Sequence, residues 1–356
     1  MLLDFSYFTD IPYSIIREIA EKVAEINAKA QKEEERVIDL SMGQNFIANS
    51  RIILEKIRFL KERRFDEPIL YEASLGAKDI RELIVKNYYR FFYRFSEDLL
   101  SADNIMITDG AYGAVRNAMA AILRPGDIVV FDRVTFRYFV YMLIVMGRLL
   151  PHVRPFIIPA NEDTGFVPPA DEVIECLQEL KTAHPDKNIV YYTQFGFNPM
   201  GCFRSERDLR EIVRFVENEP NIFLINDIVY HLIRWERRGI PLASILADEG
   251  LGIVDADTLS KPYGVMGLRV GALITRDKEL FRRAALAQQY IVVSPNRFAT
   301  EVWRVVANPE NLPEIIKNFL QKRLRIWVSP YVKGERGQYM SSQEFGRNLQ
   351  CFRESS

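Results

Sequence analysis

Short apolar runs alternate with helical stretches from about residue 103 onward, and this alternation leaves few architectures open to the chain. The runs are rich in β-branched and aromatic residues and read, in chain order, NIMIT, DIVVF, FIIP, NIVYYT, NIFLIN and VGALIT. Helical patterns separate most of them, at about residues 112–123, 171–180 and 205–217. Strand–helix alternation predicts a mostly parallel sheet with helices on both faces. In such sheets ligands bind where strands end and loops begin.

Helices are expected on both sides of this region. An amphipathic helix is predicted at residues 14–31, because one face carries Ile15, Ile16, Ile19, Val23 and Ile26. Two more helices are expected near residues 52–63 and 79–95, and residues 282–329 read mainly as helix. The tail that follows, residues 329–356, is polar and weakly patterned.

The composition argues against several classes of protein. The chain has 356 residues, with 47 basic and 48 acidic side chains, so bulk charge predicts neither nucleic-acid nor membrane binding. No apolar run reaches the ~18 residues of a membrane helix, and the start lacks a secretory pattern. Widely spaced cysteines and few histidines argue against a metal cluster and favour a reducing, cytoplasmic location. These residues are Cys176, Cys202, Cys351, His152, His184 and His231.

The segment TDGAYGAVRNAM follows the first predicted strand, and its small residues open a helix. Free N–H groups and the positive end of the helix dipole form a cradle for phosphate at such a start. An ordinary strand-to-helix turn has the same composition, so both interpretations stay open here.

Two further segments carry polar groups at strand ends. Asn198 begins an Asn-Pro-Met-Gly turn in YYTQFGFNPMGCF, where its amide can serve the turn alone or donate to a ring oxygen. Asp227 ends the strand in LINDIVYHL, with Tyr230 three residues later. The acid can cap a helix. It can also hold a heteroaromatic nitrogen protonated, because opposite charges ~4 Å apart at an effective dielectric near 20 attract by roughly 4 kcal/mol.

The segment DTLSKPYGVMGLRVG combines a lysine, an arginine and glycines. Lys261 can act as a nucleophile only when it loses its proton, which needs burial or cationic neighbours. Arg269 can grip a phosphate with its planar fork, and Gly267 and Gly271 allow close backbone approach. A glycine-rich turn with two surface cations remains the alternative.

Taken together, these segments resemble the aspartate aminotransferase family, the class I/II aminotransferases of fold type I, which use pyridoxal 5′-phosphate. The similarity covers roughly residues 40–305. Its strongest element is Thr258-x-Ser260-Lys261 followed by Gly267-x-Arg269-x-Gly271, which the family writes as S-x-S-K and G-x-R-x-G at the same spacing. The resemblance implies a mostly parallel seven-stranded sheet flanked by helices, with a reduced α+β small domain.

The resemblance also implies roles for individual residues. Lys261 is the expected Schiff-base lysine, Asp227 the acid that pairs with the pyridine nitrogen, and Tyr230 a donor to the ring oxygen. These three form the expected catalytic set. The remaining cofactor-binding residues are expected to be Gly110, Ala111 and Tyr112 in the phosphate loop, Thr258 and Arg269 on the phosphate, Asn198 on the ring oxygen, Phe136 stacked on the ring, and Tyr71 reaching the neighbouring subunit's phosphate. Gly43, in SMGQN, is a weaker candidate on the substrate side.

The expected activity is transfer of an amino group from an L-amino acid to a 2-oxo acid, by a homodimer with shared sites. The expected domains are an N-terminal arm with part of the small domain (1–45), a large cofactor-binding domain (46–285) and a shortened small domain (286–356). No arginine can be matched to the family's ligand for the substrate α-carboxylate, although Arg336, Arg347 and Arg353 are available.

Departures from the family pattern keep other outcomes open. Pro262 follows the lysine, Ile228 replaces an acid beside Asp227, and Val134 replaces a proline before Phe136. The same fold supports elimination, cyclisation or oxidation of an amino acid, and a catalytically impaired cofactor-binding homologue is a third possibility.

Overall fold

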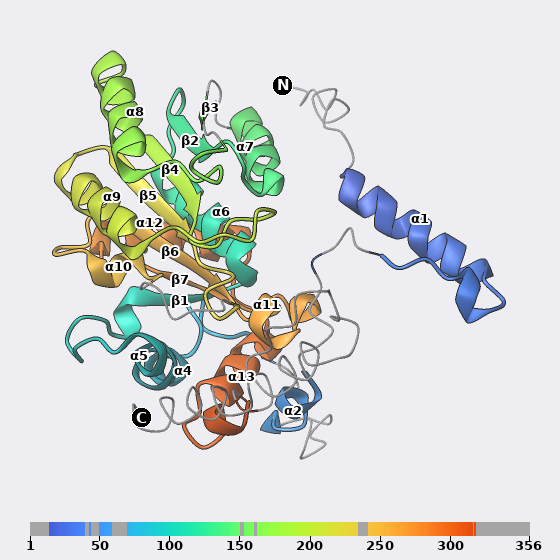
Figure 1. Ribbon diagram of the computed structural model, residues 1–356. Helices are drawn as coiled ribbons and strands as arrows, with labels where there is room; N and C mark the ends of the chain where they lie inside the picture. The colour runs from blue at the N-terminus through green and yellow to red at the C-terminus, as the bar shows by residue number, and fades with distance from the viewer. Residues whose placement is uncertain are drawn as a thin grey trace, which may run out of the picture.

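The computed structural model describes residues 14–39, 43, 50–58, 70–149, 153–159, 162–233, 241–315 and 317. A seven-stranded sheet lies at its centre, in the order β1-β7-β6-β5-β4-β2-β3 (Figure 1). Strand β7 runs antiparallel to both of its neighbours, and the remaining pairs are parallel. The mostly parallel sheet expected from the sequence is therefore confirmed.

Strands and helices alternate along the chain as the sequence predicts. The strands are β1 (Ile105–Thr108), β2 (Ile128–Asp132), β3 (Arg154–Ile158), β4 (Ile189–Gln194), β5 (Ile222–Asp227), β6 (Ile253–Thr258) and β7 (Gly271–Ile274). The helices between them are α6 (Gly110–Ile122), α7 (Arg137–Leu149), α8 (Ala170–Ala183), α9 (Glu206–Asn218), α10 (Ala243–Leu246) and α11 (Ser260–Tyr263), with a 3-10 turn, η5 (Met266–Leu268).

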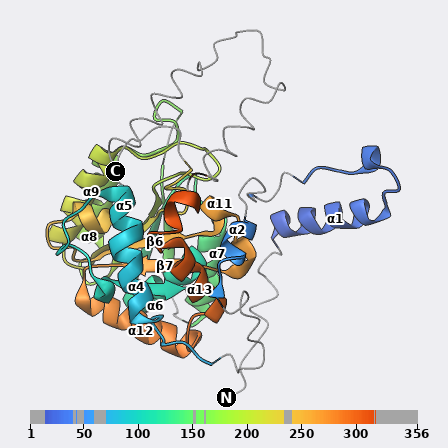
Figure 2. The ribbon, with the colours of Figure 1, turned by 90° about the horizontal axis from the view of Figure 1, so that it is seen from below.

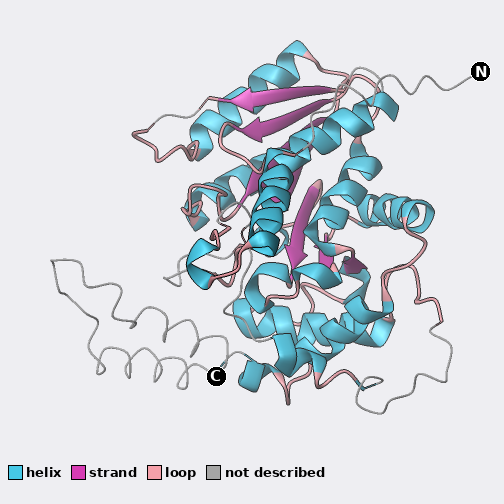
Figure 3. Cartoon of the chain, turned by 90° about the vertical axis from the view of Figure 1, so that its right-hand side faces the viewer, coloured by secondary structure: helices cyan, strands magenta, loops and turns pink. Residues whose placement is uncertain are grey.

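Helices cover both faces of the sheet, as Figure 3 shows. One core packs α6, α7 and α12 (Lys278–Ile291) against one face. The other core holds α8, α9 and α10, together with the helical segments before β1 and after α12. Those segments are α2 (Ser50–Leu54), α4 (Lys78–Leu83), η3 (Ile84–Tyr89), α5 (Arg90–Tyr93) and α13 (Arg297–Val306). A 3-10 turn, η4 (Ala102–Asn104), directly precedes β1. Central strands buried on both sides explain the continuous apolar runs of the sequence.

Two expectations from periodicity need correction. Strand β6 was not among the predicted runs, because Asp255 and Asp257 interrupt its apolar pattern, yet both acids are fully buried and hydrogen-bonded. The helix expected at residues 282–329 is broken at 292–296, where Val293 has a positive φ and Asn296 caps α13.

The N-terminal helix was predicted correctly. Helix α1 (Ile15–Lys29) begins at Ser14, whose hydroxyl accepts the Arg17 N–H. It projects from the body in two perpendicular views (Figures 1 and 2), and a short 3-10 helix, η2 (Glu33–Glu35), follows it. Its apolar residues Ile15, Ile19 and Ile26 are exposed.

The three expected domains stay a prediction, because residues 318–356, most of the expected small domain, lie outside the described residues. In the part of the chain that is described, no helix combines the length and apolarity needed to cross a membrane.

Candidate active site

The sheet brings the predicted residues of distant segments to one edge. Asp227, the last residue of β5, lies in register with Gln194 of β4 and Ala256 of β6. Strand β6 then ends at Thr258, and Lys261 follows on α11. Because the parallel strands β4, β5 and β6 end at the same edge, Asp227 and Lys261 come close enough for each to shift the pKa of the other.

Lys261 lies in surroundings that disfavour its charged form. Burial of the amine and the neighbouring Arg269 guanidinium lower its pKa, against an opposing attraction from Asp227. Its Nζ donates to the Gly43 carbonyl at 2.7 Å, so the weaker candidate Gly43 does lie at the site. A β-carbon at Gly43 would lie 3.7 Å from this nitrogen. A lysine with a lowered pKa can act as a nucleophile near neutral pH.

Asp227 is a buried acid whose two oxygens each accept a hydrogen bond. The Tyr192 hydroxyl donates to Oδ2 at 2.7 Å, and the Val229 N–H donates to Oδ1 at 3.1 Å. Burial raises the pKa of Asp227 to about 6, while both hydrogen bonds and Lys261 pull it down. The carboxyl therefore ionises easily when a cation approaches it.

The loop after β1 forms a narrow cradle against Arg269. Gly110 has φ +81°, and a β-carbon there would lie 2.7 Å from Nη2 of Arg269. A β-carbon at Gly271 would lie 2.4 Å from the Gly110 backbone, so neither glycine can be replaced without movement. The Arg269 guanidinium donates to the carbonyls of Asp109 and Met266 at 3.3 and 3.0 Å. It thus lies across the start of α6, where the first N–H groups are available to an anion.

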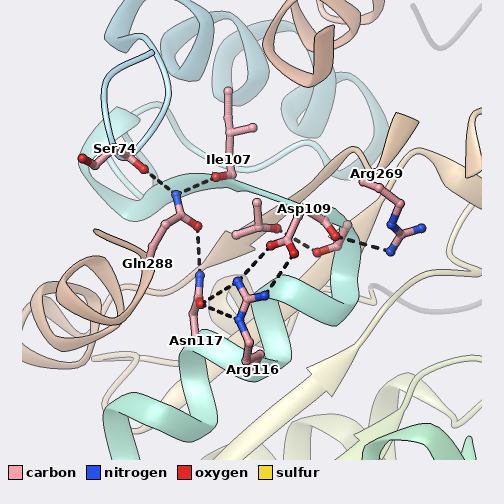
Figure 4. Close-up of polar contacts among 9 residues, drawn as sticks. Ser74, Ile107, Asp109, Arg116, Asn117, Arg269 and Gln288 are labelled. Carbon is pink, nitrogen blue, oxygen red and sulfur yellow. Dashed lines mark hydrogen bonds and ion pairs between the residues drawn. The ribbon is translucent and has the colours of Figure 1, made fainter. Parts of the chain in front are cut away.

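A hydrogen-bonded chain supports this cradle from behind (Figure 4). Arg116 binds both oxygens of Asp109 at 3.0 Å and also donates to the Asn117 amide oxygen. Asn117 donates to Gln288 of α12, whose Nε2 donates to the carbonyls of Ile107 and Ser74. These hydrogen bonds link α6, α12, β1 and segment 70–76, and no local sequence pattern indicates them.

The other predicted residues surround the same edge. Thr258 donates its hydroxyl to the Val270 carbonyl at 2.6 Å and lies 2.9 Å from Ser260 Oγ. Asn198, which a cis peptide bond joins to the following Pro199, donates its backbone N–H to Oε1 of Gln194. Burial and Asp227 raise the pKa of Tyr230 to about 12.

Four more predicted residues have contacts or exposures that do not test their expected roles. Tyr112 stacks on Phe139, and Phe136 stacks on Tyr138, with ring centroids 5.5 and 5.0 Å apart. Tyr71 is 88% exposed. Ala111 is buried at the start of α6. The roles expected for these residues stay predictions.

Sequence reasoning missed a buried cluster beside the site. Asp257 accepts from Tyr89 at 2.7 Å and from the Thr258 N–H at 2.6 Å, and its Oδ1 lies 3.3 Å from His231 Nε2. His231 in turn bonds Tyr93 through Nδ1. Burial raises the pKa of Asp257 to about 8, so this carboxyl favours its neutral form. In the sequence, the two acids of β6, Asp255 and Asp257, were the feature that could have indicated this cluster.

The residues at this edge suit a flat, phosphorylated, aldehyde-bearing ring. An arginine and a helix start offer phosphate contacts, an easily ionised buried acid suits a ring nitrogen, and an amine of lowered pKa suits an aldehyde. The Nε2 of Gln194 is also buried without a hydrogen-bond partner among the described residues, next to Asp227 in the sheet. Across those same residues, no group of three or more His, Cys, Asp or Glu side chains could hold a metal ion.

Comparison with known proteins finds one family. The family model for aminotransferase class I and II matches residues 35–327. The aspartate aminotransferase of Thermotoga maritima is 30% identical over 72% of this chain, and the chain spans only 63% of that relative. The aspartate aminotransferase of Pyrococcus horikoshii is 23% identical, covering 92% of this chain and 83% of the relative.

Solved structures show the same fold. The aspartate aminotransferase of Thermus thermophilus, determined with maleate, superposes with a TM-score of 0.73 at 18% identity, covering 91% of this chain and 77% of that one. At this identity the likeness concerns the fold alone, and it confirms the fold-type I architecture expected from the sequence.

Proposed function

The chain belongs to the class I and II aminotransferase family, and from this premise we propose that it is a pyridoxal 5′-phosphate-dependent aminotransferase. The proposed reaction moves the amino group of an L-amino acid to a 2-oxo acid. The observation that carries the proposal is the placement of Lys261 beside both Asp227 and Arg269. Asp227 comes from a distant strand, whereas Arg269 follows in the same short segment, and both neighbours shift the pKa of Lys261.

The proposed cofactor contacts follow from the donors present. Arg269 and the N–H groups at the start of α6 would hold the phosphate, with Thr258 and Ser260 beside them. Asp227 would pair with the ring nitrogen, and Asn198 and Tyr230 would donate to the ring oxygen. Phe136 is proposed to stack on the ring. When bound, this cofactor supplies an aldehyde that condenses with amines and a ring that accepts an electron pair.

The protein's own groups would handle the protons. Lys261 has a lowered pKa, so its amine can give up a proton and then take one from the α-carbon of the substrate. Tyr230, with a pKa of about 12, stays protonated throughout the physiological range, so its hydroxyl would be available as a hydrogen-bond donor. Asp227 would pair with the ring nitrogen and so favour its protonated form, which would help the cofactor withdraw electrons from the α-carbon.

We also propose a homodimer with shared sites. Gln288 binds the Ser74 carbonyl, so segment 70–74 lies beside the end of α12. Large apolar side chains are exposed on both: Leu70, Tyr71, Leu286, Tyr290, Ile291 and Val293. Exposed apolar residues gathered on adjacent segments are typical of protein interfaces, and a partner there would receive Tyr71. Arginines 336, 347 and 353, the available ligands for a substrate carboxylate, lie outside the described residues.

The test is an absorbance titration of the full-length protein with pyridoxal 5′-phosphate. We expect a band near the visible edge that is absent in Lys261→Ala. Amino acids are then screened for spectral change, with and without a 2-oxo acid. Turnover that requires the oxo acid supports transamination. Ammonia release without an acceptor, or oxygen consumption, would favour elimination or oxidation, and an unchanged band in Lys261→Ala would remove the assigned role of this lysine.

A further inference from the structure

We propose that Tyr192 is a positioning residue for the proposed reaction: its hydroxyl fixes the orientation of the Asp227 carboxylate and stabilises the anion that would hold the ring nitrogen. The inference rests on the proposed function for the role of Asp227, and on the structure for the contact itself. Tyr192 was not a candidate in the sequence, because it lies inside the apolar run of β4.

The alternation of β4 places Tyr192 beside Asp227. In the sheet register Tyr192 pairs with Ile225, and Gln194 pairs with Asp227. Residues two apart on a strand point to the same face, so Tyr192 and Asp227 share the face covered by α6. The phenol reaches Oδ2 at 2.7 Å, a normal length for a hydroxyl donating to a carboxylate.

Packing leaves the phenol little freedom. Tyr192 is fully buried, and its ring lies between Phe139 and Phe131 at centroid distances of 4.8 and 5.7 Å. Burial and Asp227 raise the pKa of Tyr192 well above its usual range. The hydroxyl therefore keeps its proton and acts as a fixed donor. The Val229 N–H donates to the other oxygen, Oδ1, and the two donors together hold the carboxylate in one orientation.

Other ionisable groups face Asp227 from every side. Lys261 on α11 favours the anion, whereas the acid Asp257 on β6 and the phenol of Tyr230 would disfavour it if ionised. Burial is the largest influence and favours the neutral acid. Against these influences, the Tyr192 hydroxyl donates a direct hydrogen bond to the carboxylate.

The chain offers a matched control on the opposite face. Tyr191 is equally buried and donates to another buried acid, Asp132, at the same distance of 2.7 Å. Tyr191→Phe and Tyr192→Phe thus remove chemically similar bonds from neighbouring positions of one strand. Only the second change alters the surroundings of Asp227.

The experiment follows the protonated-carboxyl infrared band of Asp227 against pH in the cofactor-free full-length protein, with Asp227→Asn identifying the band. A hydrogen bond to a charged group corresponds to roughly one to two pH units. We expect Tyr192→Phe to raise the pKa of Asp227 by that amount, and Tyr191→Phe to leave it unchanged. The dissociation constant of pyridoxal 5′-phosphate near pH 7 should then rise about tenfold in Tyr192→Phe and stay unchanged in Tyr191→Phe.

A second variant keeps the inference testable if Tyr192→Phe does not fold. Fluorotyrosine at position 192 keeps the shape and makes the phenol a stronger donor, so the pKa of Asp227 should fall. An unchanged Asp227 titration in a folded Tyr192→Phe or fluorotyrosine protein overturns the inference. The two proposals can fail separately. If the wild-type protein does not bind the cofactor but the pKa of Asp227 still changes with substitutions at position 192, the proposed function is wrong and the inferred contact stands.

Discussion

Substitution of Gly110 by alanine tests whether the turn before α6 is an anion cradle. Its φ of +81° lies in the left-handed region, which costs a residue with a β-carbon roughly 1–2 kcal/mol. Alanine also restricts the unfolded chain more than glycine does, which stabilises the folded state by about 0.4–1 kcal/mol. We therefore expect the free energy of unfolding to fall by about 1 kcal/mol overall. The new β-carbon also meets Arg269 Nη2 at 2.7 Å, and this flexible side chain would give way.

Displacement of Arg269 should affect binding more than stability. An arginine hydrogen-bonded to a phosphate contributes roughly 1.5–3 kcal/mol, which corresponds to about a 10- to 100-fold change in dissociation constant. Gly110→Ala should therefore weaken the binding of pyridoxal 5′-phosphate by about tenfold or more. Pyridoxal, which lacks the phosphate, should bind as it does to wild type.

Gly165 provides the control. Its φ is +61°, and a β-carbon there would have nothing within 4 Å. Gly165→Ala carries a similar backbone cost without the contact to Arg269. Urea unfolding should give similar losses for both variants, and fluorescence titration should show weaker cofactor binding in Gly110→Ala alone. Two results would refute the assignment of this turn to the phosphate. One is that Gly110→Ala weakens the binding of pyridoxal and of pyridoxal 5′-phosphate equally, and the other is that Gly165→Ala weakens cofactor binding to a similar degree.

Three further predictions concern charge and assembly. Arg116→Gln should weaken cofactor binding about tenfold, because it leaves Asp109 uncompensated beside the anion, and Asp109→Asn in the same chain should restore it, measured by titration. Asp257→Asn should flatten the fall in stability between pH 4 and 8, measured by urea unfolding: the unfolded acid loses its proton near pH 3.8 and the folded one near pH 8, so rising pH favours unfolding of wild type. Lys261→Ala and Tyr71→Ala chains, each inactive alone, should regain activity when mixed if sites are shared.

The sheet could be predicted because its strands are buried on both faces and therefore apolar throughout. The exception, β6, shows the limit of that signal. Asp255 is held by Asn226 and by the N–H groups of Ala243 and Ser244, and these partners lie up to 29 residues away. Periodicity cannot reveal such partners, because only the folded sheet brings them together.

The site divides in a similar way. Lys261 and Arg269 stand in one short motif, and its resemblance to the family pattern implied a shared task that their spacing alone left open. Tyr192 and Gln194 lie in a strand where every residue is buried, and nothing in the local pattern separates a packing tyrosine from one that bonds an acid. The relay from Arg116 to Gln288 joins residues 171 positions apart at its widest step and depends on the packing of α6 against α12.

Charge at the strand ends explains why two buried acids can lie near an anion site. If Asp227 and Asp257 were both ionised, their charges would cancel those of Lys261 and Arg269 and weaken attraction for a phosphate. Burial holds Asp257 largely neutral at pH 7, while Asp227, with two hydrogen-bond donors and Lys261 beside it, ionises near pH 6. The bidentate pair of Asp109 with Arg116 is neutral as a whole. At neutral pH Asp227 is then the one of these two acids that carries a charge, and it is the carboxylate proposed to pair with a cationic ring.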